Sequence, residues 1–195
     1  MRADPGRGTP GGLGEAFDPV LGAARTGAAW ALERLFTTYA AAVAGYLRSQ
    51  GAEDPEGLAN EVFFSAFRAL ASFAGSEQAF RSWLFTIAHN RLVDERRRRG
   101  RRVQTTAVAE PDDRPDDGAN PEAWALASLG NSRVRTLLDG LSDDQRDVLL
   151  LRIVGDLTVD QVAEAVGKRP GAVKALQRRG LAALREQLER EGVTL

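Results

Sequence analysis

The sequence predicts an all-α fold in which two small helical domains are joined by an extended acidic linker. Apolar residues recur at helical spacing in two blocks, residues 28–102 and residues 122–195. The segment between them, residues 103–121, lacks this periodicity and places three prolines among five acidic side chains. In the second block, Ser142 with Gln145 and Thr158 with Gln161 form capping-box patterns, which mark the starts of helices.

The composition of this 195-residue chain excludes several classes of protein. It has no cysteine for disulfides or thiolate metal sites, and its one histidine, His89, cannot supply a histidine cluster. No nucleophile elbow, phosphate-binding loop or metal-ligand cluster is present, so we expect no enzyme, metal or cofactor. No apolar run approaches the roughly 18 residues of a membrane helix, and the start of the chain does not read as a signal peptide. We therefore expect a cytoplasmic protein without membrane insertion.

Three helices are predicted in the first block. Residues 1–27 are rich in Gly and Pro, and we interpret them as a disordered N-terminal segment. Helices should then cover about 28–49, about 55–72, and a third stretch that begins at Ser76 or Glu77. Because the connections between them are short, they should pack as a small bundle.

The second block is predicted to end in a helix-turn-helix. A helix over about 122–138 comes first, and a short apolar-striped helix later ends at Gly167. Pro170 opens the next helix only three residues further on, and that helix should run to about residue 189. In such a motif the second helix enters the DNA major groove, and its first residues reach base edges.

Basic residues gather on this last helix. The run from Lys168 to Arg185 carries six positive charges and no acidic side chain. Lys174 and Arg178 share one outer stripe, and Arg179 lies beside it. This pattern favours binding to nucleic acid, although a basic helix face can also be simply solvated.

Residues 80–102 begin as an apolar helix and end in a dense run of arginines. Trp83, Asn90 and Arg97 recur at seven-residue spacing, so they share one helix face. An aromatic ring, an amide and a cation in line can stack on a base, read its edge and hold its phosphate. The plain alternative is that Trp83 belongs to the core and Asn90 is a surface amide. Six arginines within residues 96–102 repel one another, which favours phosphate binding over a role in solubility.

Both blocks resemble the extracytoplasmic-function sigma factors, the smallest members of the sigma-70 class of bacterial transcription initiation subunits. The stretch EDPEGLANEVFFSAFRALASFAGSEQAFRSWLFTIAHNRLVDERRR is similar to their region 2. The stretch LSDDQRDVLLLRIVGDLTVDQVAEAVGKRPGAVKALQRRGLAALRE is similar to their region 4. The resemblance covers roughly residues 28 to 188 and implies domains at 28–102 for region 2 and 122–195 for region 4.

The resemblance implies that core RNA polymerase is a partner, through its largest-subunit clamp and its flap region. The family's clamp-docking helix usually reads Asp-Leu-x-Gln-Glu, and here the matching residues are Gly57-Leu58-Ala59-Asn60-Glu61. Leu58, Asn60 and Glu61 are therefore the implied polymerase contacts. An anti-sigma factor is a further expected partner, and the acidic linker resembles the family's connector.

Two sets of promoter contacts follow from the same resemblance. In region 2, Phe73 and Asn90 match the pocket that captures a flipped minus-10 base, and His89 stands where Arg is frequent. The implied minus-10 contacts are Phe73, Ser76, Trp83, His89, Asn90, Arg96, Arg97, Arg98 and Arg99. In region 4, Arg169 stands where the family often has Ser. The implied minus-35 contacts are Arg169, Gly171, Lys174, Ala175, Arg178 and Arg179.

Two other readings of the chain remain open at this point. A helix-turn-helix regulator that acts without polymerase would explain residues 141–188, and it should bind duplex DNA tightly on its own. A purely structural helical adaptor would show no salt-dependent affinity for DNA.

Overall fold

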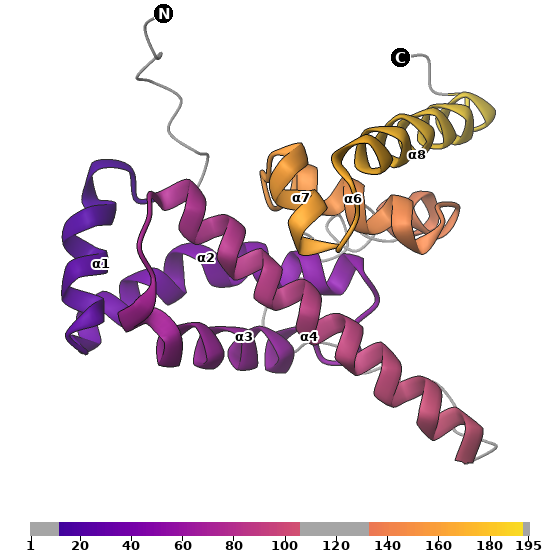
Figure 1. Cartoon of the computed structure of the whole chain (residues 1–195). Helices are drawn as coiled ribbons and strands as arrows, with labels where there is room; N and C mark the ends of the chain where they lie inside the picture. Colours follow the sequence, from indigo (N-terminus) through magenta and orange to yellow (C-terminus); the bar gives the residue numbers. More distant parts are fainter. Residues whose placement is uncertain (1–11, 106–132, 193–195) are drawn as a thin grey trace, which may run out of the picture.

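The computed structural model describes residues 12–105, the N-terminal block, and residues 133–192, the C-terminal block (Figure 1). Every regular element in these two ranges is helical, which confirms the all-α expectation. The predicted linker start at residue 103 is wrong, because residues 103–105 continue the helix that begins at Glu77; the rest of the acidic linker and the predicted helix start near residue 122 lie outside the described residues. No helix within the described ranges has both the length and the apolar character needed to cross a membrane.

Four α-helices build the N-terminal block. They are α1 (Phe17–Arg25), α2 (Ala29–Ser49), α3 (Pro55–Ala69) and α4 (Glu77–Thr105), with 3₁₀ turns at Gly14–Ala16 and Leu70–Ser72. Asp54 caps α3 as expected, because its side chain accepts a hydrogen bond from the backbone N–H of Gly57 at 2.8 Å. The C-terminal half of α4 extends beyond the other helices of the bundle (Figure 1).

The interpretation of residues 1–27 as disordered is wrong for the part that the structure describes. Helix α1 buries Phe17, Val20, Leu21 and Ala24 against the bundle. These positions have the i, i+3, i+4, i+7 spacing of an amphipathic helix, which the surrounding Gly and Pro residues obscured. The Glu77 carboxylate anchors the preceding segment by accepting hydrogen bonds from the backbone N–H groups of Leu13 and Gly14.

The C-terminal block contains a helical stretch over residues 133–139, then α6 (Asp143–Ile153), α7 (Val159–Ala165) and α8 (Pro170–Arg190). Both predicted capping boxes are present, at Ser142 with Gln145 and at Thr158 with Gln161. Gly167 adopts φ +64° in the turn between α7 and α8, a conformation that favours glycine. The helix-turn-helix is therefore confirmed.

The two blocks pack against each other, which the sequence did not predict. Helix α7 lies against α4, and α6 lies against α2 (Figure 1). The buried apolar residues of both blocks belong to one continuous cluster.

Candidate nucleic-acid interface

Helix α4 carries the predicted single-strand face. It is continuous from Glu77 to Thr105, so Trp83, Asn90 and Arg97 follow one another along one side of it. Trp83 is half-buried, whereas Asn90 and Arg97 are exposed. Seven residues of α-helix span about 10 Å, which is roughly three times the spacing of about 3.4 Å between successive nucleotides of a strand.

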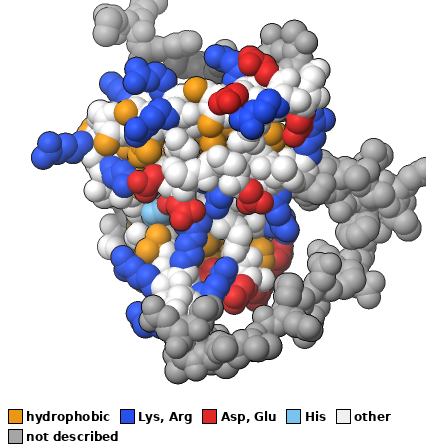
Figure 2. Space-filling view, turned by 90° about the vertical axis from the view of Figure 1, so that its right-hand side faces the viewer, with side chains coloured by type: hydrophobic (Ala, Val, Ile, Leu, Met, Phe, Trp, Pro, Cys, Tyr) orange, Lys and Arg blue, Asp and Glu red, His pale blue; other side chains and the backbone are white. Residues whose placement is uncertain are grey.

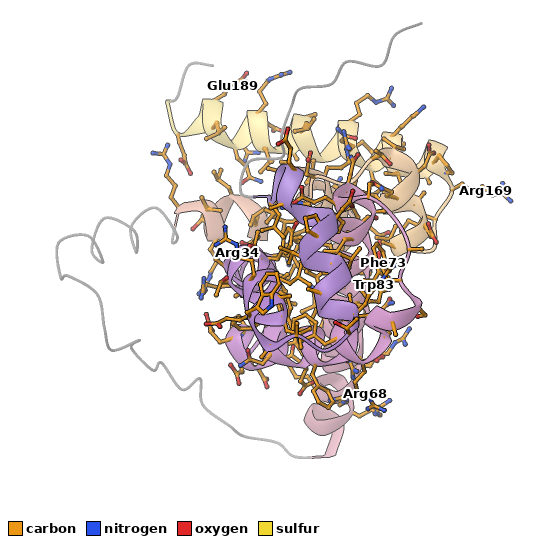
Figure 3. All side chains as sticks on the ribbon, turned by 90° about the vertical axis from the view of Figure 1, so that its left-hand side faces the viewer. Arg34, Arg68, Phe73, Trp83, Arg169 and Glu189 are labelled. Atoms are coloured by element: carbon orange, nitrogen blue, oxygen red, sulfur yellow. The ribbon has the colours of Figure 1, made fainter. Side chains whose placement is uncertain are left out.

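The aromatic end of this face is closely packed. The rings of Phe73 and Trp83 lie next to each other (Figure 3) and are stacked, with centroids 5.1 Å apart. Phe80 contacts both of these rings. Ser76 begins α4 as a cap, because its hydroxyl accepts a hydrogen bond from the backbone N–H of Ala79 at 3.3 Å. Trp83 therefore contributes to packing, and its partner Phe73 comes from the loop that the family resemblance implicates in base capture.

The four consecutive arginines have different environments. Arg96 is turned toward the C-terminal block, and its Nη2 donates to Gln50 Oε1 at 2.8 Å. Arg99 forms an ion pair with Glu53 at 3.0 Å, and Arg97 lies 3.7 Å from Asp94 on its own helix. Within the described residues no ion pair engages the exposed Arg98. Arg97 and Arg98 are therefore the two cations of this run that are best placed for a phosphate.

His89 is not available to DNA in this arrangement, contrary to its place among the expected contacts. Its side chain is 5 % exposed, and its Nδ1 lies 3.1 Å from the hydroxyl of Tyr46. Burial lowers the pKa of His89 below its ordinary value of 6.5, and the positive charge of Arg96 lowers it further, while Asp147 opposes the shift. His89 is thus a neutral core residue near neutral pH.

The implied polymerase contacts lie on α3. Leu58 is buried in the bundle, while Asn60 and Glu61 are exposed. They border a shallow hollow of about 510 Å³ that is also lined by Phe64, Ser65 and Arg91. Phe64 is 65 % exposed, and sequence reasoning missed it. The signal was present, because adjacent helical residues point about 100° apart and Phe63 already faces the core.

Helix α8 presents the expected duplex-binding face. Arg169, Gly171, Lys174, Arg178 and Arg179 are exposed, and Ala175 is half-buried. Arg169 projects from the N-terminal end of the helix (Figure 3). Among the described residues no carboxylate forms an ion pair with Arg169, Lys174, Arg178 or Arg179, whereas Lys168 pairs with Asp144 at 2.9 Å. Figure 2 shows basic side chains on both blocks of the molecule.

Close packing fixes the position of α8. Val173, Leu176 and Gly180 face inward, and a Cβ atom on Gly180 would lie 2.8 Å from Leu149 Cδ1 of α6. The absence of a side chain at Gly180 therefore lets α8 approach α6 closely. This contact holds the basic face outward.

Family models match both blocks in the expected order. Residues 35–102 match the model described as Sigma-70 region 2, and residues 132–184 match that of Sigma-70, region 4. The ECF RNA polymerase sigma factor ShbA of Streptomyces griseus is 35% identical over 136 residues, which cover 69% of this chain and 71% of that protein. The chain belongs to the extracytoplasmic-function sigma factors. It is therefore an alternative sigma factor, a subunit that directs transcription initiation by RNA polymerase.

Other sigma factors are similar over more of the chain. SigD of Mycobacterium tuberculosis is 31% identical over 185 residues, which cover 92% of this chain and 87% of that protein. A solved structure of the sigma factor RpoE from Bartonella quintana, in complex with the anti-sigma factor NepR, matches with a TM-score of 0.61. It is 23% identical and covers 80% of this chain and 96% of that chain, so this likeness concerns the fold. Together these matches extend over both blocks of the sigma factor.

Proposed function

We propose that this sigma factor divides promoter recognition between α4 and α8 and binds core RNA polymerase through the hollow beside α3. The region 2 domain would cover residues 28–105, because α4 ends at Thr105, and the region 4 domain residues 122–195, with the linker between them. Asn60, Glu61 and the exposed Phe64 would contact the polymerase clamp. We place the protein in the cytoplasm because core RNA polymerase works there.

The observation that carries this proposal is the basic face of α8. Lys174, Arg178 and Arg179 lie away from the side of the helix that is packed on α6, and Arg169 lies at the helix's N-terminal end; none of the four has an ion-pair partner among the described residues. Such a face can enter a major groove, where a bidentate Arg–base contact is worth about 1–3 kcal/mol of discrimination. The alternative hypothesis is a helix-turn-helix regulator that acts without polymerase. Such a regulator would use only α7 and α8, so this hypothesis gives the N-terminal block no role.

Asn90 is the residue that we assign to the minus-10 element. Its exposed amide can read the edge of an unpaired base, and Arg97 and Arg98 can hold the neighbouring phosphates. Each stacked base is worth about 1–3 kcal/mol, so trapping one or two bases shifts the duplex toward opening without ATP. In this mechanism the sigma factor performs no catalysis, and the polymerase carries out the chemistry.

The most direct test is transcription in vitro with core polymerase on a genomic library, reading start sites and the motifs upstream of them. Asn90→Ala should spare binding to core polymerase but weaken binding to a single-stranded minus-10 oligonucleotide. Gln78→Ala is the matched control, because Gln78 is an exposed amide on another face of the same helix. If both variants bind the oligonucleotide equally well, Asn90 is only a surface amide.

An anti-sigma factor is proposed as a further partner. The support is that the similar RpoE was solved in complex with the anti-sigma factor NepR. A search for a binding partner should therefore begin with proteins that compete with core polymerase for this chain.

A further inference from the structure

The side chain of Glu77, the first residue of α4, joins three segments of the N-terminal block. Its Oε1 accepts hydrogen bonds from the backbone N–H of Leu13 and from the hydroxyl of Tyr39, and its Oε2 accepts one from the N–H of Gly14 at 2.9 Å. Hydrogen bonds to a charged acceptor are among the stronger ones in proteins. One carboxylate therefore ties the segment before α1 and the middle of α2 to the first turn of α4.

The backbone of residues 12–14, which we call the glycine cradle, is shaped to hold this carboxylate. Leu13 has right-handed helical angles (φ −86°, ψ −19°), and Gly14 has φ +57°, a conformation that favours glycine. A right-handed residue followed by a left-handed one directs successive N–H groups into a concave site for an anion. A Cβ atom on Gly12 would lie 2.6 Å from Glu77 Oε1, so a side chain there would meet the bound carboxylate.

The loop at residues 73–76, which carries Phe73, is supported at both ends by the segment that contains the cradle and α1. Before the loop, the 3₁₀ turn Leu70–Ser72 lies against α1. After the loop comes Glu77, which the cradle binds. Between these ends the loop turns back tightly on itself, because a Cβ atom on Gly75 would lie 3.3 Å from Phe73 Cζ. The position of Phe73 therefore depends on both supports.

An aromatic cluster connects the same parts inside the bundle. Phe80 is fully buried, and its ring centroid lies 5.7 Å from that of Phe17 in α1 and 5.5 Å from that of Tyr39 in α2. It also lies 5.5 Å from the ring of Phe73 and 5.9 Å from that of Trp83. Because such close packing transmits displacements, a shift of α1 or of the start of α4 would move the Phe73 and Trp83 rings.

From these contacts we propose that Glu77 is a positioning residue for base capture, which holds the loop at residues 73–76 in place by binding the glycine cradle. Glu77 touches no base and acts through the position of the Phe73 ring. This inference rests on the proposed function, since it assigns to the loop the capture of an unpaired minus-10 base. The cradle lies outside the match to the region 2 model, which begins at residue 35.

The negative charge of Glu77 separates this proposal from simple electrostatics. A carboxylate beside a DNA-binding loop repels phosphates, so its removal should strengthen DNA binding if the loop keeps its position. If the carboxylate positions the loop, its removal should weaken DNA binding. The two explanations therefore predict affinity changes of opposite sign.

The affinity of the full-length chain for a single-stranded minus-10 oligonucleotide measures this change, with the sequence taken from the start sites found by transcription. Glu77→Ala should weaken binding by about fivefold or more, the equivalent of one lost stacking interaction. Glu77→Gln should lose less, because its amide oxygen still accepts a hydrogen bond while its amide nitrogen cannot. Glu33→Ala is the matched control, since it removes an exposed carboxylate of α2. Equal affinities of Glu77→Ala and Glu33→Ala would overturn the proposal.

An abasic site in the oligonucleotide separates positioning from a general loss of fold. The captured position is the one at which an abasic site weakens binding by the parent protein most. Glu77→Ala should weaken binding to the intact oligonucleotide but leave the affinity for this abasic one close to that of the parent. If both affinities fall by the same factor, Glu77 serves only the stability of the fold, and the positioning role is wrong.

Gly12→Ala tests the cradle from its other side. In the parent protein the new methyl group displaces the Glu77 carboxylate, so oligonucleotide binding should weaken. In the Glu77→Ala background no carboxylate remains to be displaced, so Gly12→Ala should have no further effect. Gly22→Ala, where no other group lies within 4 Å of the added atom, should leave binding unchanged in both backgrounds. Additive losses from Gly12→Ala and Glu77→Ala would contradict a shared role.

Fluorescence without DNA distinguishes failure of this inference from failure of the proposed function. With Trp30 and Trp124 replaced by Phe, Trp83 is the only tryptophan of the chain. Its emission should move to longer wavelength in Glu77→Ala but not in Glu33→Ala, because displacement of the Phe73 ring exposes the indole to water. Circular dichroism should show unchanged helix content in both variants. If the emission stays the same, Glu77 does not position the loop. If the emission moves but even the parent protein binds no minus-10 oligonucleotide, the proposed function fails and the structural link from Glu77 to the loop stands.

Discussion

The ring of Phe73 stacks on that of Trp83, with centroids 5.1 Å apart and planes inclined by 25°. The pair joins the loop after α3 to the first turns of α4, at the aromatic end of the predicted single-strand face. A base that enters this site must stack on the outer side of the pair or displace the Phe73 ring. Phe73 is therefore a packing residue in the free protein and a candidate stacking residue in the complex.

Phe73→Leu separates these two roles. Leucine keeps much of the apolar volume, so the free energy of unfolding should fall by less than about 1.5 kcal/mol. Loss of the ring should weaken binding to a single-stranded minus-10 oligonucleotide by about 1–3 kcal/mol if the ring stacks on a base. Phe67→Leu, at a partly buried aromatic residue of α3, is the control. Equal affinity losses in the two variants would limit Phe73 to packing.

Gly180→Ala should destabilise the C-terminal block. The new methyl group would lie 2.8 Å from Leu149 Cδ1, so the buried Leu149 side chain must change its conformation or α8 must move away from α6, at a cost of about 1–3 kcal/mol. Gly22→Ala in α1 is the matched control, since no other group lies within 4 Å of the added atom. That variant should gain about 0.5–1 kcal/mol from the better helix propensity of alanine. Urea unfolding of both variants measures the change in the free energy of unfolding. If both variants are stabilised or both are destabilised relative to the parent protein, the prediction is wrong.

Acidification should destabilise the fold through His89. In the unfolded chain this imidazole takes up a proton near pH 6.5, whereas burial and the positive charge of Arg96 lower its pKa in the folded protein against the opposing charge of Asp147. The unfolded state therefore binds more protons below pH 6.5, and stability is lost as the pH falls from there toward the lowered pKa. Urea midpoints at about pH 7.5 and about pH 5.5 should differ in the parent protein and differ less in His89→Gln. If the urea midpoint changes equally with pH in both proteins, other titratable groups cause the loss of stability.

Arg179 should read bases in the duplex. Arg179→Ala is expected to lower the ratio of specific to random duplex binding, by about 1–3 kcal/mol for a lost base-edge contact. Arg185→Ala, which removes an exposed arginine further along α8, should weaken both kinds of binding alike. Titrations of the full-length chain with specific and with random duplex DNA, at several salt concentrations, measure the two affinities. An unchanged ratio for Arg179→Ala would place that side chain on the phosphate backbone.

Local patterns predicted the helices well where their signals were strong. Asp54 and the capping boxes at Ser142 and Thr158 specify helix starts through hydrogen bonds between residues three positions apart. Such starts can therefore be predicted from the sequence. Helix α1 was missed because Gly and Pro around it imitate a disordered composition. The segment before it, at Leu13 and Gly14, is anchored by Glu77, more than sixty residues away, and no local pattern reveals that contact.

The sequence predicted which side chains of the candidate site are exposed on their helices, but not the tertiary contacts that surround the others. The exposure of Asn90 and of the α8 cations follows from helical periodicity, and the structure agrees. The burial of His89 and the engagement of Arg96 depend on tertiary contacts with Tyr46 and Asp147. Those contacts arise between segments that are distant in sequence, so composition and spacing could not distinguish Arg96 from its neighbour Arg97.

The continuity of α4 restricts how this gene can vary in length. One inserted codon between Asn90 and Arg97 would turn every later side chain by about 100° and shift it by about 1.5 Å along the axis. The arginines would then leave the side of the helix that carries Asn90, and Arg96 would lose its alignment with Asp147. A loop would absorb such an insertion, but a rigid helix transmits it. Substitutions are therefore the only kind of change that this stretch of the reading frame can easily accept.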